Sequence, residues 1–170
     1  ANMPISYDPI GFFNTPHKDV RDMPIQPPGA LGVRGSILVL PEYREGLADL
    51  DGFSHIIVLY HLHRVRGRDL RVIPFLDTRE HGIFATRSPR RPNPVGLSVL
   101  RVNAVTEVAV FVENVDMLDG TPVIDIKPYV PDFDVWPAER VGWFEGRSCN
   151  AGHARSDARF ACPKAELVED

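Results

Sequence analysis

The sequence predicts a mainly β protein: a closed or nearly closed β-barrel with few short helices and a C-terminal extension. Segments of β-branched and apolar residues recur at strand spacing along most of the chain, and turn signals separate them. Few stretches have the periodicity of a helix. Closing such strands into a barrel removes the exposed edges at which other chains could pair, so a barrel is favoured over an open sheet.

The N-terminal half contains the strongest predicted strand. Residues 31–40 alternate in polarity and then become apolar, which indicates a strand. Residues 42–50 are amphipathic and predict one or two helical turns that lead into the Asp51-Gly52 turn. Residues 53–65 are apolar too continuously for a strand with one face in solvent, so this strand is expected in the core.

The rest of the chain contributes the remaining strands. The dipeptide Asp119-Gly120 has the chemistry of a tight hairpin turn, and it predicts that the last two strands pair with each other. In chain order, these further strands are predicted over residues 71–76, 82–85, 95–105, 108–117 and 123–126.

A chain of 170 residues fits one compact domain. We expect the barrel over residues 1–134 and a C-terminal appendage over residues 135–170. Within the appendage, residues 137–146 begin with proline and end with glycine, which predicts a short helix. Cys149 and Cys162 do not make a disulfide framework. No segment approaches the roughly 20 apolar residues of a membrane helix and the chain does not begin with a signal pattern, so a cytoplasmic protein is expected.

Charge is distributed unevenly along the chain. The net charge is −4, yet the segment from His61 to Arg101 contains nine arginines and only three acidic residues. A cationic stretch on an otherwise acidic protein can steer an anionic partner to one face. A solvated arginine-rich surface explains the same pattern, so charge alone leaves both interpretations open.

The most distinctive segment, residues 85–98, interleaves prolines with arginines. Proline fixes the backbone and removes a hydrogen-bond donor, so Arg87, Arg90 and Arg91 are expected to project from a rigid loop outside the sheet. A guanidinium group suits bidentate contact with a carboxylate or a phosphate. The candidate partners are therefore a cofactor carboxylate, a nucleic-acid backbone or an acidic protein surface, and a rigid solvated turn is the remaining interpretation.

A pair of histidines suggests a competing chemistry. In a continuous strand, His61 and His63 would lie on one face, where two imidazoles could ligate a metal in the manner of a cupin-like enzyme. No third ligand occurs at a supporting spacing, so we expect no metal and interpret these histidines as core or pocket residues. Gly29, Gly32 and Gly35 precede a strand rather than a helix, so they are not a dinucleotide-binding motif.

Four sequence blocks resemble, in chain order, the signature blocks of the TsaA-like (TrmO-type) family. They cover residues 51–56, 82–88, 91–98 and 119–129, and the Pro27-Pro28-Gly29 loop fits the same pattern. The resemblance implies a single-sheet barrel that binds S-adenosyl-L-methionine (SAM) without a Rossmann fold, and a homodimer. It also implies a SAM-dependent methyltransferase acting on N6 of threonylcarbamoyladenosine in tRNA. Longer members carry a separate C-terminal domain, which the tail of this chain does not resemble.

The resemblance assigns site residues by motif. The implied SAM pocket draws on the first loop, the end of the core strand, the arginine-proline block and the turn before the last strand: Gln26, Pro27, Pro28, His63, Arg64, Arg87, Leu97, Asp116, Leu118, Asp119 and Gly120. The residues expected to contact the tRNA substrate are Arg90, Arg91, Asn93 and Tyr129. An acylated N6 is a poor nucleophile, so a base should help, and Asp125 and His63 are the candidates.

Two other functions stay open at the level of the sequence. One is a metal-dependent barrel enzyme that uses His61 and His63. The other is a non-catalytic RNA-binding barrel, which would bind tRNA without a cofactor and with a steep dependence on salt.

Overall fold

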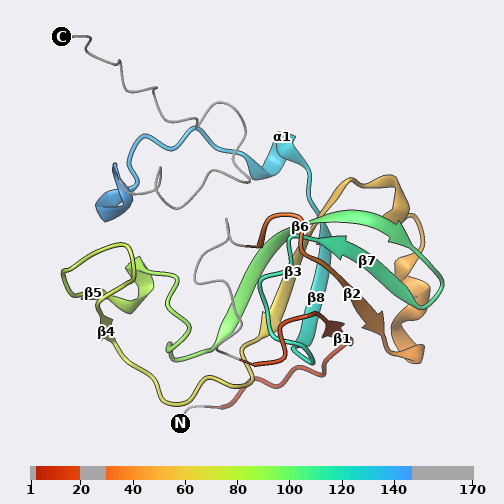
Figure 1. Cartoon of the computed structure of the whole chain (residues 1–170), viewed down its shortest axis with the longest axis horizontal. Coiled ribbons are helices and arrows are strands. Elements are labelled where there is room, and N and C mark those ends of the chain that lie inside the picture. Colours follow the sequence, from red (N-terminus) through yellow and green to blue (C-terminus); the bar gives the residue numbers. More distant parts are fainter. Residues whose placement is uncertain (1–2, 20–29, 147–170) are drawn as a thin grey trace.

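Six antiparallel strands close into one barrel in the computed structural model, which describes residues 3–19 and 30–146 (Figure 1). Around the barrel the strands follow the order β1-β2-β7-β6-β3-β8, and β8 pairs back onto β1. They are β1 (Gly11–Asn14), β2 (Arg34–Val39), β3 (His55–His61), β6 (Val95–Val105), β7 (Ala109–Glu113) and β8 (Pro122–Pro128). The predicted closed barrel is confirmed.

The barrel interior is filled by the inward side chains of its strands. On β3, Ile56, Val58 and Tyr60 are buried, whereas Ile57 and Leu59 between them are partly covered. This strand pairs with β6 on one side and β8 on the other along most of its length. Its outward apolar residues are partly covered, so neither face of β3 is fully in solvent. Buried side chains from the other strands complete the core, among them Phe13, Ile37, Leu100, Val112 and Val123.

Most predicted elements are present with small differences in their bounds. The strand predicted over residues 95–105 has the bounds of β6, and the amphipathic stretch forms two 3₁₀ segments, Pro41–Leu47 and Leu50–Gly52. The strands predicted over 71–76 and 82–85 are much shorter than expected. They reduce to β4 (Arg71–Val72) and β5 (His81–Gly82), a separate two-stranded sheet followed by a 3₁₀ turn at Ile83–Ala85.

The predicted hairpin at Asp119-Gly120 is wrong. Strand β7 pairs with β2 and β6, while β8 lies between β3 and β1, so the two strands joined by this turn do not pair. The turn itself forms, with Gly120 at φ 78°, but its backbone N–H donates to Phe13 O at 2.8 Å instead of closing a hairpin. The connection between β7 and β8, which contains this turn, therefore crosses the end of the barrel to reach a strand position that is not next to β7.

The short helix predicted over residues 137–146 is also wrong. The α-helix of the described chain, α1 (Pro131–Asp134), lies before the predicted segment, which itself contains only a 3₁₀ turn at Gly142–Phe144. Gly142 has φ 57°, a left-handed conformation that interrupts a right-handed helix. The Trp143 indole N–H donates to Ala85 O at 2.7 Å, so a tertiary contact directs this segment.

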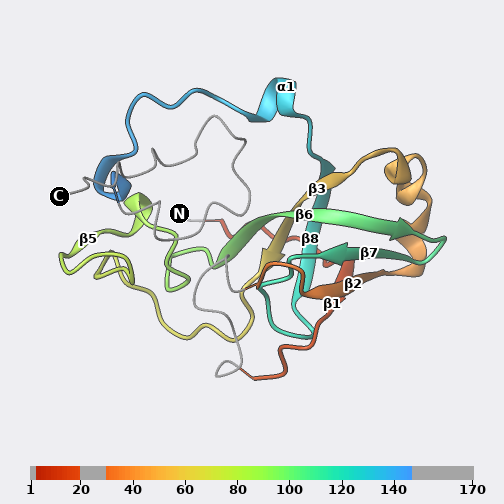
Figure 2. The ribbon, with the colours of Figure 1, turned by 45° about the horizontal axis from the view of Figure 1, so that its top comes forward.

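Residues 62–94, which connect β3 to β6, form a long excursion beside the barrel (Figure 2). The excursion carries β4 and β5, and the 3₁₀ turn near Trp143 lies against it. In the described residues, no helix has the length and apolar character needed to cross a membrane.

Candidate functional site

A hollow of about 210 Å³ opens at the end of the barrel where β3 finishes and the β7–β8 connection passes. Apolar side chains make most of its walls, and an imidazole, a guanidinium and a carboxylate contribute polar groups. The lining residues are Tyr60, Leu62, His63, Arg64, Val65, Pro89, Asp116, Met117, Leu118 and Thr121. The structure thus brings together four of the eleven residues that the family motifs imply for a SAM pocket: His63, Arg64, Asp116 and Leu118.

One wall of the hollow is backed by a chain of hydroxyl groups. Asp116 accepts a hydrogen bond on Oδ1 from Ser98 Oγ at 3.2 Å. Ser98 Oγ lies 2.9 Å from the Tyr60 hydroxyl, and both residues are buried. The sequence pattern does not single out Tyr60 and Ser98 as site residues, because each resembles an ordinary inward-facing strand residue.

A further part of the lining follows the end of β3. The strand finishes at His61, and Leu62 N–H then donates to Pro94 O at 2.8 Å, so His63 lies in a turn. The strand alternation that would put both histidines on one face therefore does not reach His63. His63 keeps much of its surface exposed, and its partial burial lowers its pKa below 6.5; the nearby positive charges of Arg64 and His61 lower it further.

A metal centre finds no support in the described residues. Within residues 3–19 and 30–146, no three His, Cys, Asp or Glu side chains gather as a metal-binding group. The cupin-like alternative based on His61 and His63 is therefore not favoured.

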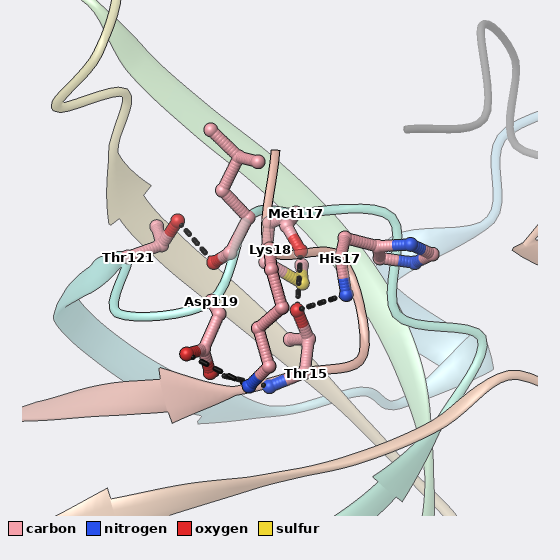
Figure 3. A network of polar contacts seen from close by, with 7 residues as sticks. Thr15, His17, Lys18, Met117, Asp119 and Thr121 are labelled. Atoms are coloured by element: carbon pink, nitrogen blue, oxygen red, sulfur yellow. Dashed lines mark hydrogen bonds and ion pairs between the residues drawn. The ribbon is translucent and has the colours of Figure 1, made fainter. Parts of the chain in front are cut away.

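Asp119 belongs to a network that fixes the β7–β8 connection (Figure 3). Its Oδ1 accepts from Thr15 N–H at 2.9 Å, and its Oδ2 pairs with Lys18 Nζ at 2.9 Å. The hydrogen bond from Lys18 lowers the pKa of Asp119, and that from the Thr15 backbone lowers it further. The carboxylate thus faces the segment after β1, a different environment from the cofactor contact that the motif implies.

The same network holds the wall of the hollow from behind. Thr15 Oγ1 donates to Met117 O at 2.9 Å, and Thr121 Oγ1 donates to Leu118 O at 2.7 Å. Buried His17 places Nε2 3.0 Å from Val115 O, and since a carbonyl can only accept, Nε2 carries a proton. Sequence reasoning missed Thr15 and His17, because their partners lie about a hundred residues away along the chain.

The arginine-proline block divides into exposed and internally bonded side chains. Arg91 Nη1 donates to Thr86 O at 2.9 Å and Ser88 O at 3.1 Å, so this guanidinium stabilises its own loop. Arg90 pairs with Asp69 at 3.0 Å and remains about half exposed. Arg87 is exposed and does not line the hollow.

Other predicted site residues lie away from the hollow. Leu97 points outward from β6 with 62% exposure, and Asn93 is exposed before that strand. Asp125 on β8 pairs with Lys127 Nζ at 2.8 Å. Tyr129 donates its backbone N–H to His55 O at the other end of β3, about 20 Å from the hollow at the usual rise of a strand. Gln26, Pro27 and Pro28 lie outside the described residues.

The fold and the site define a small antiparallel barrel with a polar-edged ligand hollow at one end. The chain belongs to the family described as the tRNA-methyltransferase O N-terminal domain, whose model matches residues 12–135.

Individual relatives agree with this assignment. A Pyrococcus abyssi protein described as a probable S-adenosyl-L-methionine-binding protein is 47% identical, over 92% of this chain and 85% of that protein. The mouse tRNA (adenine(37)-N6)-methyltransferase is 36% identical over 75% of this chain, which covers 31% of the mouse protein. The crystal structure of TrmO from Pseudomonas aeruginosa matches with a TM-score of 0.68 and 34% identity, over 83% of this chain and 63% of that one. This chain therefore spans less than two thirds of the latter two proteins.

Proposed function

We propose that this chain is a SAM-dependent methyltransferase that methylates N6 of threonylcarbamoyladenosine in tRNA. The observation that carries the proposal is the convergence of Arg64 and Asp116, from distant parts of the sequence, on one hollow. His63 and Leu118, also implied by the family motifs, line the same hollow. The descriptions of the relatives as SAM-binding proteins and tRNA adenine N6-methyltransferases support the cofactor and the acceptor.

The residues of the hollow suit the parts of SAM. The cofactor supplies an electrophilic methyl group on a positively charged sulfonium, next to an ammonium and a carboxylate. The Asp116 carboxylate would attract the positive groups, and the Arg64 guanidinium would pair with the cofactor carboxylate. Leu62, Met117 and Leu118 would exclude water. At about 210 Å³ the hollow is smaller than the roughly 300–1,000 Å³ of typical ligand clefts, so it would hold one end of the cofactor.

His63 is the better supported of the two candidate bases. Its lowered pKa leaves the imidazole neutral at neutral pH, so the ring can accept a proton. In the proposed reaction, His63 would accept the proton of N6, and the bound cofactor would supply the methyl group that N6 takes up. Asp125 pairs with Lys127 and does not line the hollow, which argues against it.

The arginines of the excursion are the proposed contacts to tRNA phosphates. Arg66, Arg68 and Arg87 are exposed, and none of them makes an ion pair within residues 3–19 and 30–146. Such free cations would bind phosphates with affinity that falls steeply with salt. Half-exposed Arg90 could exchange Asp69 for a phosphate, whereas the internal bonds of Arg91 favour a structural role.

Three further features belong to the proposal: the oligomeric state, which the family resemblance implies, and the location and domain division, which the sequence pattern predicts. We expect a homodimer located in the cytoplasm. We also retain the division into a barrel over residues 1–134 and an appendage over 135–170, since the last barrel strand ends at Pro128 and the family match ends at residue 135.

The test is a calorimetric titration of SAM into the wild type, Arg64→Ala and Arg87→Ala, followed by methyl transfer to threonylcarbamoylated tRNA. The wild type should bind saturably, and Arg64→Ala should bind at least about tenfold more weakly because a charged contact is lost. Arg87→Ala should keep its affinity for SAM and lose turnover on tRNA. Failure of the folded wild type to bind SAM would contradict the proposal, and loss of SAM binding in Arg87→Ala would extend the cofactor site to that arginine.

A further inference from the structure

The chain of hydroxyl groups behind the hollow has a defined direction. An ionised carboxylate can only accept hydrogen bonds, so Ser98 must donate its single hydroxyl proton to Asp116. Ser98 Oγ is then the acceptor for Tyr60, whose hydroxyl lies 2.9 Å away. The chain therefore runs from Tyr60 through Ser98 to the carboxylate of Asp116, which lies in the wall of the hollow.

The position of Tyr60 is fixed by the strands around it. On β6, Gly96 is the register partner of Tyr60, and a Cβ atom at residue 96 would overlap the tyrosine ring. Phe13 on β1 makes a T-shaped contact with the same ring, with centroids 5.9 Å apart and an angle of 88° between the ring planes. Tyr60 and Ser98 are each only 7% exposed, so the hydroxyl groups are held inside the barrel rather than hydrated.

A buried donor chain of this kind has a consequence for the carboxylate that it reaches. The hydrogen bond from Ser98 restricts the orientation of the Asp116 carboxylate. Its neighbours in the wall, Met117 and Leu118, are apolar, and a fixed negative charge interacts with a cation more strongly there than in water. Such a charge selects a positively charged ligand group.

We propose that Tyr60 and Ser98 are positioning residues that hold the Asp116 carboxylate toward the cationic end of SAM, the sulfonium with its neighbouring ammonium. This inference rests on the proposed function, and it adds a structural reason why the hollow would select a positively charged cofactor. Ser98 does not line the hollow, whereas Tyr60 does; the proposed role of both is to hold Asp116 rather than to contact the cofactor.

The test compares ligands that share the adenosine part but differ in charge. Calorimetry would measure the Kd of SAM and of methylthioadenosine, which lacks both positive groups, for the wild type, Tyr60→Phe, Ser98→Ala and Asp116→Asn. Tyr60→Phe and Ser98→Ala should each raise the Kd of SAM about 3- to 10-fold, and Asp116→Asn should raise it at least as much. The Kd of methylthioadenosine should change by less than about twofold in all three variants. The double variant Tyr60→Phe/Ser98→Ala should be no weaker than Ser98→Ala, because Tyr60 acts through Ser98.

Tyr43→Phe is the matched control, since Tyr43 does not line the hollow and should leave both affinities unchanged. Thermal unfolding would establish that each variant is folded. S-adenosylhomocysteine keeps the ammonium and lacks the sulfonium charge, so a smaller loss than for SAM supports the sulfonium as the partner of Asp116 and an equal loss supports the ammonium.

Equal weakening of SAM and methylthioadenosine would show a merely structural role and overturn the inference. Unchanged SAM affinity in Tyr60→Phe and Ser98→Ala, with normal binding by the wild type, would overturn this inference and leave the proposed function standing. A folded wild type that does not bind SAM would overturn both.

Discussion

The barrel and the excursion are stabilised in different ways. Barrel strands pair along most of their length and enclose apolar side chains that are almost fully buried. The excursion has two strands of two residues each and exposes the large apolar side chains of Leu70, Ile73, Phe75 and Phe84. The comparison indicates a rigid barrel beside a segment that presents many of its side chains outward. The hollow draws on both regions, since the two ends of the excursion contribute Leu62, His63, Arg64, Val65 and Pro89 to its lining.

Apart from buried Ile83, specific individual contacts stabilise the excursion. Asp77, whose side chain is 4% exposed, lies 2.6 Å from His81 Nε2, and the His81 ring stacks on Trp143 with centroids 4.8 Å apart. Arg71 and Glu80 form a further ion pair near the paired strands. The shape of the excursion therefore depends on a few individual residues, whereas that of the barrel depends on a repeating pattern.

The largest expected effect is a difference between the two regions in how much one substitution lowers the free energy of unfolding. Leu100→Ala on β6 removes a side chain with 0% exposure and should destabilise the protein by about 2–5 kcal/mol, because the barrel cannot collapse around the cavity. Phe84→Ala in the excursion removes a side chain that is 79% exposed and should change stability by less than about 0.5 kcal/mol. Urea unfolding measures both, and similar losses would mean that the excursion contributes to the same cooperative core.

A smaller effect is expected where the barrel supports the hollow. Gly96→Ala would force the Tyr60 ring to move and should cost about 1–3 kcal/mol, with weaker SAM binding. Gly46→Ala is the control, since a Cβ atom there meets nothing within 4 Å. The free energy of unfolding and the affinity for SAM would both be measured. A Gly96→Ala protein with wild-type stability and affinity would show that the packing of Gly96 against Tyr60 does not constrain the site.

The contrast between the two regions also explains how much the sequence predicts. Strand β6 has its predicted bounds because alternation between inside and outside is a local pattern. The exchange of partners that places β8 between β3 and β1 has no local signature, so Asp119-Gly120 was expected to close a hairpin. In the excursion, Arg71 and His81 lie in strands of two residues each and make an ion pair and a ring contact that periodicity cannot anticipate.

The site divides in the same way. His63 and Asp116 were predicted because they lie in or near sequence blocks that resemble a family. Tyr60 and Ser98 were not, since a hydrogen bond between residues on neighbouring strands depends on the register of pairing. Thr15 reaches Met117 and Asp119 only once the barrel has closed.

The smallest expected effect concerns the carboxylate behind the hollow. Because the pKa of Asp119 is lower in the folded protein than the ordinary 3.8, its ionised form stabilises the fold above about pH 4. Asp119→Asn should cost about 0.5–1 kcal/mol at pH 7, and the difference from the wild type should shrink as pH falls through the folded pKa. Urea unfolding at pH 7, 4 and 3 measures this, with Asp51→Asn as an exposed control. A stability difference that stays constant with pH would mean that the hydrogen bond from Thr15 matters more than the charge paired with Lys18. The reason is that asparagine can keep or lose this hydrogen bond but does not titrate.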